Sequence, residues 1–305
     1  ARPPVALIAG GRPDQAKELE EVGIRTYLHV PSPGLLVQYL EGGARRFVFE
    51  GRECGGHVGP RSSLVLWEQA VEALLEAVDR GRSAEDLHVL FAGGLHDARS
   101  AAAVAAIAAP LAARGARIGV LVGTAYLFTE EAVATGAIVP RFQAEAIRCS
   151  ETVLLETGPG HEVRVGPSPF ALSFVEARRR LIAGGGSTEE VRNALEAMNA
   201  GRLRIATKGM DRADGAVSPL VAVDEADQYE RGAYMLGQAA ALRDRVTTIS
   251  ELHRELSEGC DAVLQALEIG EPAEPGEKPK PSDIAIIGLS AIMPGAPDVR
   301  TFWEN

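Results

Sequence analysis

Residues 46–59, RFVFEGRECGGHVG, join a run of strand-forming apolar residues to residues that could do chemistry. The run ends at a glutamate, and Gly55, Gly56 and His57 follow soon after it. Glycines let a flat ligand lie against bare backbone, and an imidazole beside that ligand can act as an acid, a base or a hydrogen-bond donor. A glycine turn with a solvated histidine explains the same short segment equally well.

Two later glycine corners favour a ligand site. Gly93 and Gly94 follow one apolar run, and Gly123 and Thr124 follow the next. Glycine removes the Cβ that would hold an anion away from backbone N–H groups, and a threonine hydroxyl adds a donor. Corners of this kind after consecutive strands are typical of the phosphate site of a barrel enzyme, so we expect them to bind a phosphate together.

These corners must be positioned by a repeated unit of strand, loop and helix. Each apolar run is followed by a loop with Gly or Pro and then by a helical stretch that ends near a Gly, a common helix stop. This alternation indicates parallel strands joined by right-handed crossovers. The expected strands are VALIAG (5–10), RTYLHV (25–30), RFVFEG (46–51), LHVLFAGG (87–94) and RIGVLVGT (117–124).

The repeated unit predicts an α/β fold class. A complete (β/α)8 barrel has eight such units, and about five are present in residues 1–150. We therefore expect this region to be the C-terminal part of a TIM-type barrel, with about three units upstream of a chain that is an excerpt. The expected C-terminal extension, residues 151–267, is helical, and Ser187 and Glu190 in it have capping-box spacing.

The last part of the chain changes character. Residues 268–283, EIGEPAEPGEKPKPSD with its Pro, Glu and Lys, are typical of a solvated linker. The strand-like IAIIGLS follows, so residues 284–305 are predicted to begin a second domain.

The composition excludes several kinds of partner. A formal charge of −11 and a pI near 5.2 argue against a nucleic-acid partner. The sequence contains neither a long apolar span nor a signal peptide. We therefore expect a cytoplasmic protein without a membrane partner. The cysteines Cys54, Cys149 and Cys260 are far apart and odd in number, so we expect neither a metal site nor a disulfide framework.

Together, these motifs resemble a known family. The order of Glu-Cys-Gly-Gly-His, Ala-Gly-Gly-Leu and Val-Gly-Thr-Ala-Tyr-Leu, with Thr-Glu-Glu-Ala just after, is similar to the nitronate monooxygenase (2-nitropropane dioxygenase) family. That family consists of FMN-dependent barrels and includes enoyl-acyl carrier protein reductases and the enoyl reductase component of polyunsaturated fatty acid synthases. The resemblance covers roughly residues 5–150.

The resemblance implies roles for the residues of all three corners. Gly93, Gly94, Gly123 and Thr124 are expected to hold the FMN phosphate. Gly55 and Gly56 are expected to pass close to the flavin, and His57 to be the catalytic residue beside its ring. Cys54 stands where many relatives have Ala, and a small buried side chain is favoured there over a redox thiol.

The later segments suggest the setting. The extension resembles the tail of the polyunsaturated-fatty-acid type of reductase, and residues 283–305 resemble the start of a β-ketoacyl synthase domain of a polyketide synthase. His161 in the extension is interpreted as a solvated loop residue. Lys208 and Arg212 could meet a phosphopantetheine or nicotinamide phosphate, although a surface charge pair is commoner.

The expected reaction is reduction of an enoyl thioester on an acyl carrier protein within a polyketide or polyunsaturated fatty acid synthase. NADPH or NADH is the expected electron donor, and the adjoining ketosynthase and other synthase domains are the expected partners. Two alternatives remain: a nitronate monooxygenase that oxidises alkyl nitronates, and a non-catalytic barrel that serves as a docking scaffold.

Overall fold

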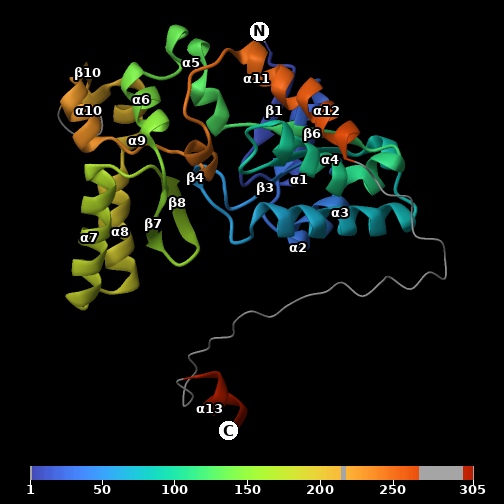
Figure 1. The fold of residues 1–305 in the computed structure, drawn as a ribbon, viewed down its shortest axis with the longest axis horizontal. Coiled ribbons are helices and arrows are strands. Elements are labelled where there is room, and N and C mark those ends of the chain that lie inside the picture. The colour runs from blue at the N-terminus through green and yellow to red at the C-terminus, as the bar shows by residue number, and fades with distance from the viewer. Residues whose placement is uncertain (1, 214–217, 268–297, 305) are drawn as a thin grey trace. The chain divides into compact units, whose positions relative to one another are not determined.

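A computed structural model describes residues 2–213, 218–267 and 298–304 of the chain. The chain divides into two units, residues 1–266 and 267–305, and Figure 1 shows the sheet and the helices of the first. In the second unit the described element is helix α13 (Val299–Glu304). The predicted linker, 268–283, and most of the predicted ketosynthase start lie outside the described residues.

The first unit is built on a parallel sheet whose strands follow one another in sequence order. The order is β1-β2-β3-β5-β6, and every neighbouring pair is parallel. The predicted parallel arrangement of the five apolar runs is therefore confirmed, and the chain forms a partial barrel. The strands are β1 (Val5–Ile8), β2 (Arg25–His29), β3 (Arg46–Glu50), β5 (His88–Ala92) and β6 (Arg117–Leu121).

Helices connect these strands, and their ends carry the expected stop and start signals. Pro13 and Pro33 stand at first helical positions, where the missing N–H costs nothing. Asp97 caps the alanine-rich helix that begins at Ala98 by accepting a hydrogen bond from Ser100 N. The connecting elements are α1 (Pro13–Glu21), α2 (Pro33–Glu41), α3 (Ser63–Asp79), the short 3₁₀ helix η1 (Ala84–Asp86) and α4 (Ala98–Ala113).

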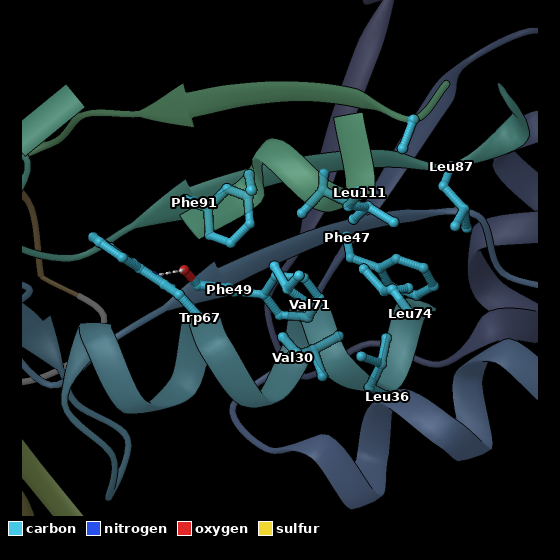
Figure 2. Packing of buried hydrophobic residues seen from close by; sticks show 14 of the residues in the cluster. Val30, Leu36, Phe47, Phe49, Trp67, Val71, Leu74, Leu87, Phe91 and Leu111 are labelled. Carbon is cyan, nitrogen blue, oxygen red and sulfur yellow. Dashed lines mark hydrogen bonds between the residues drawn. The ribbon is translucent and has the colours of Figure 1, made fainter. Parts of the chain in front are cut away.

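The main core lies between the sheet and these helices. Phe49 and Phe91 alternate with residues of the opposite sheet face and are fully buried against α3, as Figure 2 shows. The Trp67 ring packs edge-on against Phe91, and its indole N–H donates to the carbonyl of Phe49 at 3.1 Å. This buried polar contact ties α3 to the end of β3, where residues 51–57 begin.

The extension is helix-rich, but it begins with a β-hairpin that the sequence analysis does not predict. Strands β7 (Val153–Gly158) and β8 (His161–Val165) pair antiparallel, and β8 also pairs with β4 (Gly56–His57). The turn between them contains Pro159 and Gly160, and Gly160 has a φ of 75°, which glycine adopts without strain. The hairpin therefore joins the extension to the Gly-Gly-His segment of the barrel.

Helices and short strands complete the extension, and the predicted capping box of Ser187 and Glu190 is confirmed. Its helices are α7 (Pro169–Ala183), α8 (Thr188–Asn199), α9 (Arg202–Lys208), α10 (Glu225–Arg231), α11 (Ile249–Leu256) and α12 (Glu258–Ala266), with the 3₁₀ helix η3 (Gln238–Leu242) and the strand pair β9 (Met210–Arg212) and β10 (Leu220–Ala222). The 3₁₀ helix η2 (Thr124–Phe128) and helices α5 (Glu130–Ala134) and α6 (Pro140–Arg148) lie between β6 and the extension. Among the described residues, the helices are too short or too polar to cross a bilayer.

Candidate active site

A pocket of about 340 Å³ lies at the carboxyl ends of β3, β5 and β6. The structure brings the predicted Gly55, Gly93, Gly94, Gly123 and Thr124 together around it. These residues come from three different strand–helix corners, so the three corners meet at one rim of the sheet. Residues 93–95 are named the β5 corner, and residues 123–124 are named the β6 corner.

The two corners present backbone N–H groups that the protein itself does not use. Within the described part of the chain, the N–H groups of Gly94, Leu95, Gly123 and Thr124 donate to no protein acceptor. Leu95 is also buried, with 4% of its surface exposed. A buried N–H without an acceptor costs about 1–3 kcal/mol, so the Leu95 N–H is expected to meet a ligand. Gly94 and Thr124 are half-buried and Gly123 is exposed, so water reaches their N–H groups, and the four donors together offer a lining for an anion.

Close backbone packing explains why the β5 corner begins with glycine. Gly93 has a φ of 100°, and a Cβ there would lie 2.7 Å from the backbone N of Gly51 and 2.7 Å from the Ser63 hydroxyl oxygen. The corner therefore presses against the end of β3 and the first residue of α3. Any side chain at position 93 would separate these elements and move the free N–H groups.

A glutamate fixes the loop that follows β3. Glu53 Oε2 accepts hydrogen bonds from the backbone N of Ser63, at 2.8 Å, and from its hydroxyl. The carboxylate thus satisfies donors at the start of α3, where negative charge is favoured. The Ser63 hydroxyl also lies 2.9 Å from the carbonyl oxygen of Gly93, which links this loop to the β5 corner.

A segment from the extension, residues 233–239, returns to the pocket, which the sequence analysis did not foresee. Met235 and Ala239 line the pocket, and Gly237 packs between two of the corners. A Cβ on Gly237 would lie 2.9 Å from both the backbone N of Gly55 and the Thr124 hydroxyl oxygen. Since the Gly237 N–H donates to that hydroxyl oxygen at 2.9 Å, the Thr124 hydroxyl hydrogen remains available to a ligand.

Two polar residues at the strand ends were also missed as site residues. Glu50, the last residue of β3, lines the pocket, and its Oε2 lies 2.8 Å from His29 Nε2 at the end of β2. This is an ion-pair separation without the alignment of a hydrogen bond. Both residues follow the rule that carboxyl ends of barrel strands carry the functional groups, and this rule could have found them.

Cys54 lines the pocket as a neutral thiol. Burial, and then the nearby Glu50 carboxylate, raise the pKa of Cys54 to about 12, and its Sγ donates to the carbonyl of His57 at 3.3 Å. A thiol must ionise to act as a nucleophile, so this residue is held in an unreactive form at neutral pH. The geometry favours the packing role over the redox role.

His57 and Gly56 lie beside the pocket in β4. Gly56 is buried and pairs with Arg164 on β8, whereas the His57 side chain is exposed and its residue pairs with Val163. Neither is among the residues that line the pocket in the structure. The assignment of His57 as the catalytic residue stays a prediction, and any action on a ligand would come from the rim.

The polar residues singled out in the extension have local partners. Lys208 donates to the carbonyls of Gly136 and Ala137, each at 2.8 Å, and Arg212 donates to the carbonyl of Ser218 at 2.7 Å. His161 is exposed at the start of β8. None of the three is among the pocket-lining residues.

Comparison with known proteins gives the family. The family described as Nitronate monooxygenase matches residues 2–259, which is most of the chain. The chain belongs to the nitronate monooxygenase family. Members of this family are flavin-dependent oxidoreductases. No curated protein matches the chain.

Several solved structures share the fold. FabK from Thermotoga maritima has a TM-score of 0.63 and 24% identity, over 86% of this chain and 69% of that one. Nitroalkane oxidase from Streptomyces ansochromogenes has a TM-score of 0.57 and 19% identity, over 87% and 66%. The enoyl reductase domain of MlnA, from the macrolactin biosynthesis cluster of Bacillus amyloliquefaciens, has a TM-score of 0.59 and 12% identity, over 86% and 76%.

The pocket residues fit the flavin mononucleotide on which the family depends. The free N–H groups of the β5 and β6 corners and the Thr124 hydroxyl suit its phosphate dianion. Gly55 also lines the pocket, but a Cβ there would meet Leu236 and Gly237, so its missing side chain serves packing against the extension. The fit thus rests on the unused donors of the two corners.

Replacement of Gly237 by Ala should disturb the junction of corners. The added methyl group would overlap Gly55 and Thr124, so we expect a loss of about 1–3 kcal/mol in the free energy of unfolding. Denaturant titration measures this loss. Gly34→Ala in α2 is the matched control, because a methyl group there meets nothing and should change stability by about 1 kcal/mol or less, in the stabilising direction. Equal stability of the two variants would show that Gly237 is not packed tightly against Gly55 and Thr124.

The Cys54 thiol should make stability depend on pH above neutrality. The thiol ordinarily ionises near pH 9.0, but in the folded chain its pKa is raised to about 12. Above about pH 9 the unfolded state therefore binds fewer protons than the folded state, and stability falls as pH rises. Between about pH 9 and pH 10, wild type should lose about 1 kcal/mol more than Cys54→Ala in denaturant titrations. If the free energy of unfolding falls equally with pH in wild type and in Cys54→Ala, the thiol ionises in the folded chain as it does in the unfolded one.

Proposed function

We propose that this chain is part of an FMN-dependent enoyl reductase that acts on an enoyl thioester carried by an acyl carrier protein in a polyketide or polyunsaturated fatty acid synthase. The observation that carries the cofactor assignment is the set of four unused N–H donors, at Gly94, Leu95, Gly123 and Thr124, around one pocket. Family membership supports the same assignment.

The substrate class is supported by two independent features. Two of the structural relatives are FabK and the enoyl reductase domain of MlnA. In addition, residues 283–305 resemble the start of a ketosynthase, a domain that extends thioester-bound chains. A reductase placed beside such a domain would receive its substrate on a carrier protein.

The net reaction adds two hydrogens across the double bond of the thioester. A reduced nicotinamide, NADPH or NADH, supplies the hydride for the β-carbon, and a proton reaches the α-carbon. Bound FMN would supply the two-electron chemistry between donor and substrate. Gly94, Leu95, Gly123 and Thr124 would donate to its phosphate, and Gly93 would hold the β5 corner in place beside it.

We assign the proton transfer to His57. Its exposed imidazole stands in β4 directly after Gly55 and Gly56, and Cys54 Sγ fixes the His57 carbonyl. The short strand pairs with β8, so the histidine backbone is held while its ring faces solvent, from which a carrier-bound substrate arrives. From this rim it would orient the substrate carbonyl or protonate the α-carbon.

Nitronate oxidation is the second candidate, because the family description carries that activity and nitroalkane oxidase shares the fold. In that reaction His57 would act as a base on an alkyl nitronate. A non-catalytic docking scaffold is the third candidate, and an absence of bound flavin in the purified protein would favour it.

Two assays on the intact enzyme separate these functions. We expect the purified protein to carry FMN, seen by its visible absorbance, and to oxidise a reduced nicotinamide when a crotonyl thioester is added. Turnover of an alkyl nitronate with oxygen, without turnover of the crotonyl thioester, would replace enoyl reduction by nitronate oxidation. Flavin-free protein without either activity would indicate the scaffold.

Replacement of His57 by Ala should reduce single-turnover thioester reduction by roughly 10²- to 10⁴-fold, the range supplied by a positioned acid or base. Flavin content should be unchanged, because the phosphate donors lie elsewhere. His161→Ala on the adjoining strand β8 is the matched control and should retain full turnover. Wild-type turnover in His57→Ala would show that the histidine has no part in the chemistry.

A further inference from the structure

The β5 corner is bounded on its far side by a histidine that the proposed mechanism does not use. His96 Nδ1 lies 2.8 Å from the carbonyl oxygen of Gly94. A carbonyl oxygen can only accept, so Nδ1 carries the hydrogen and donates it. The histidine thus contacts the corner through the Gly94 carbonyl and leaves the pocket side of the corner open.

This contact sets the direction of an adjacent donor. The Gly94 carbonyl and the Leu95 N–H belong to one planar trans peptide and point in opposite directions. When His96 holds the carbonyl, the Leu95 N–H must point away from the imidazole. Gly94 and Leu95 line the 340 Å³ pocket, whereas His96 borders a separate polar pocket of about 310 Å³. The N–H is therefore directed to the cofactor side.

The His96 backbone is itself held from two directions. Its N–H donates to the Ser100 hydroxyl oxygen at 3.0 Å, within the first turn of α4. Its carbonyl accepts from Arg243, a residue of the extension whose guanidinium also pairs with Glu255 on α11 at 3.1 Å. The Arg243 side chain is 11% exposed, so the extension reaches the corner through a largely buried cation.

We propose that His96 is a positioning residue for the anion site: by donating to the Gly94 carbonyl it directs the Leu95 N–H toward the phosphate of the cofactor, and Arg243 anchors it from the extension. This inference rests on the proposed function, because it takes FMN as the ligand. It adds a specific requirement. A hydrogen-bond donor at the place of His96 Nδ1 raises the affinity for FMN through its phosphate and leaves the affinity for the flavin ring unchanged.

Two amide variants distinguish the position of the donor from its mere presence. The Asn side-chain nitrogen occupies nearly the place of imidazole Nδ1, whereas the Gln nitrogen occupies that of Nε2. His96→Asn should therefore keep the bond to Gly94 and bind FMN as wild type does. His96→Gln should weaken FMN binding by about tenfold, the effect of one hydrogen bond.

Riboflavin, which lacks the phosphate, separates positioning from general damage. Fluorescence titration of the apoprotein should give the same riboflavin affinity for wild type, His96→Asn and His96→Gln. Loss of riboflavin and FMN affinity in equal measure would overturn the proposal, as would an unchanged FMN affinity in His96→Gln. Arg243→Gln should show the FMN-specific loss in smaller degree. His88→Asn, at the other end of β5, is the matched control and should bind both flavins normally.

The role of His96 and the proposed function fail in different ways. Wild-type protein that binds no FMN would refute the proposed function, and the role of His96 with it. Wild-type protein that binds FMN better than riboflavin, with all His96 variants equal to it, would leave the function in place and refute the role of His96 alone.

Discussion

The site depends on the close contact of the Gly237 backbone with the backbone of Gly55 and with the hydroxyl of Thr124. None of the three corners around the pocket is rigid by itself, because each is a short loop after a strand. The contact has no room for a Cβ, and the hydrogen bond from Gly237 to Thr124 fixes its register. The spacing of the corners is thus set by a segment outside the sheet, and the unused N–H donors keep their places relative to one another.

The sheet and the glycine corners could be predicted because their signals are local. Strand runs and helix stops repeat along residues 5–124, and parallel strands place all their carboxyl ends at one edge. Gly93 and Gly123 therefore had to meet. The free energy of folding of this part is dominated by the apolar layer between sheet and helices, which the pattern of residues such as Phe49 and Phe91 already specifies.

The β7–β8 hairpin and the segment around Gly237 could not be predicted from the sequence, because they depend on contacts between distant segments. The hairpin of β7 and β8 has alternating residues around Pro159 and Gly160, yet this turn was interpreted as a loop, and its pairing with β4 has no local signal. The return of Gly237 to the pocket is likewise invisible in the sequence. His29 and Glu50 stand at strand ends and could have been found by the rule that found the glycines. The pairing of His57 with β8 could not, since the partner strand lies far along the chain.

The position of residues 233–239 in the chain bears on how the protein is made. A ribosome completes the parallel sheet long before it reaches this segment, and domains begin to fold during synthesis. At that stage the nascent chain has its strands and its glycine corners but lacks Met235, Gly237 and Ala239 around the pocket. The pocket therefore gains its full lining only after the extension has been synthesised. A chain that terminates before residue 233 has the sheet and the glycine corners without the complete site.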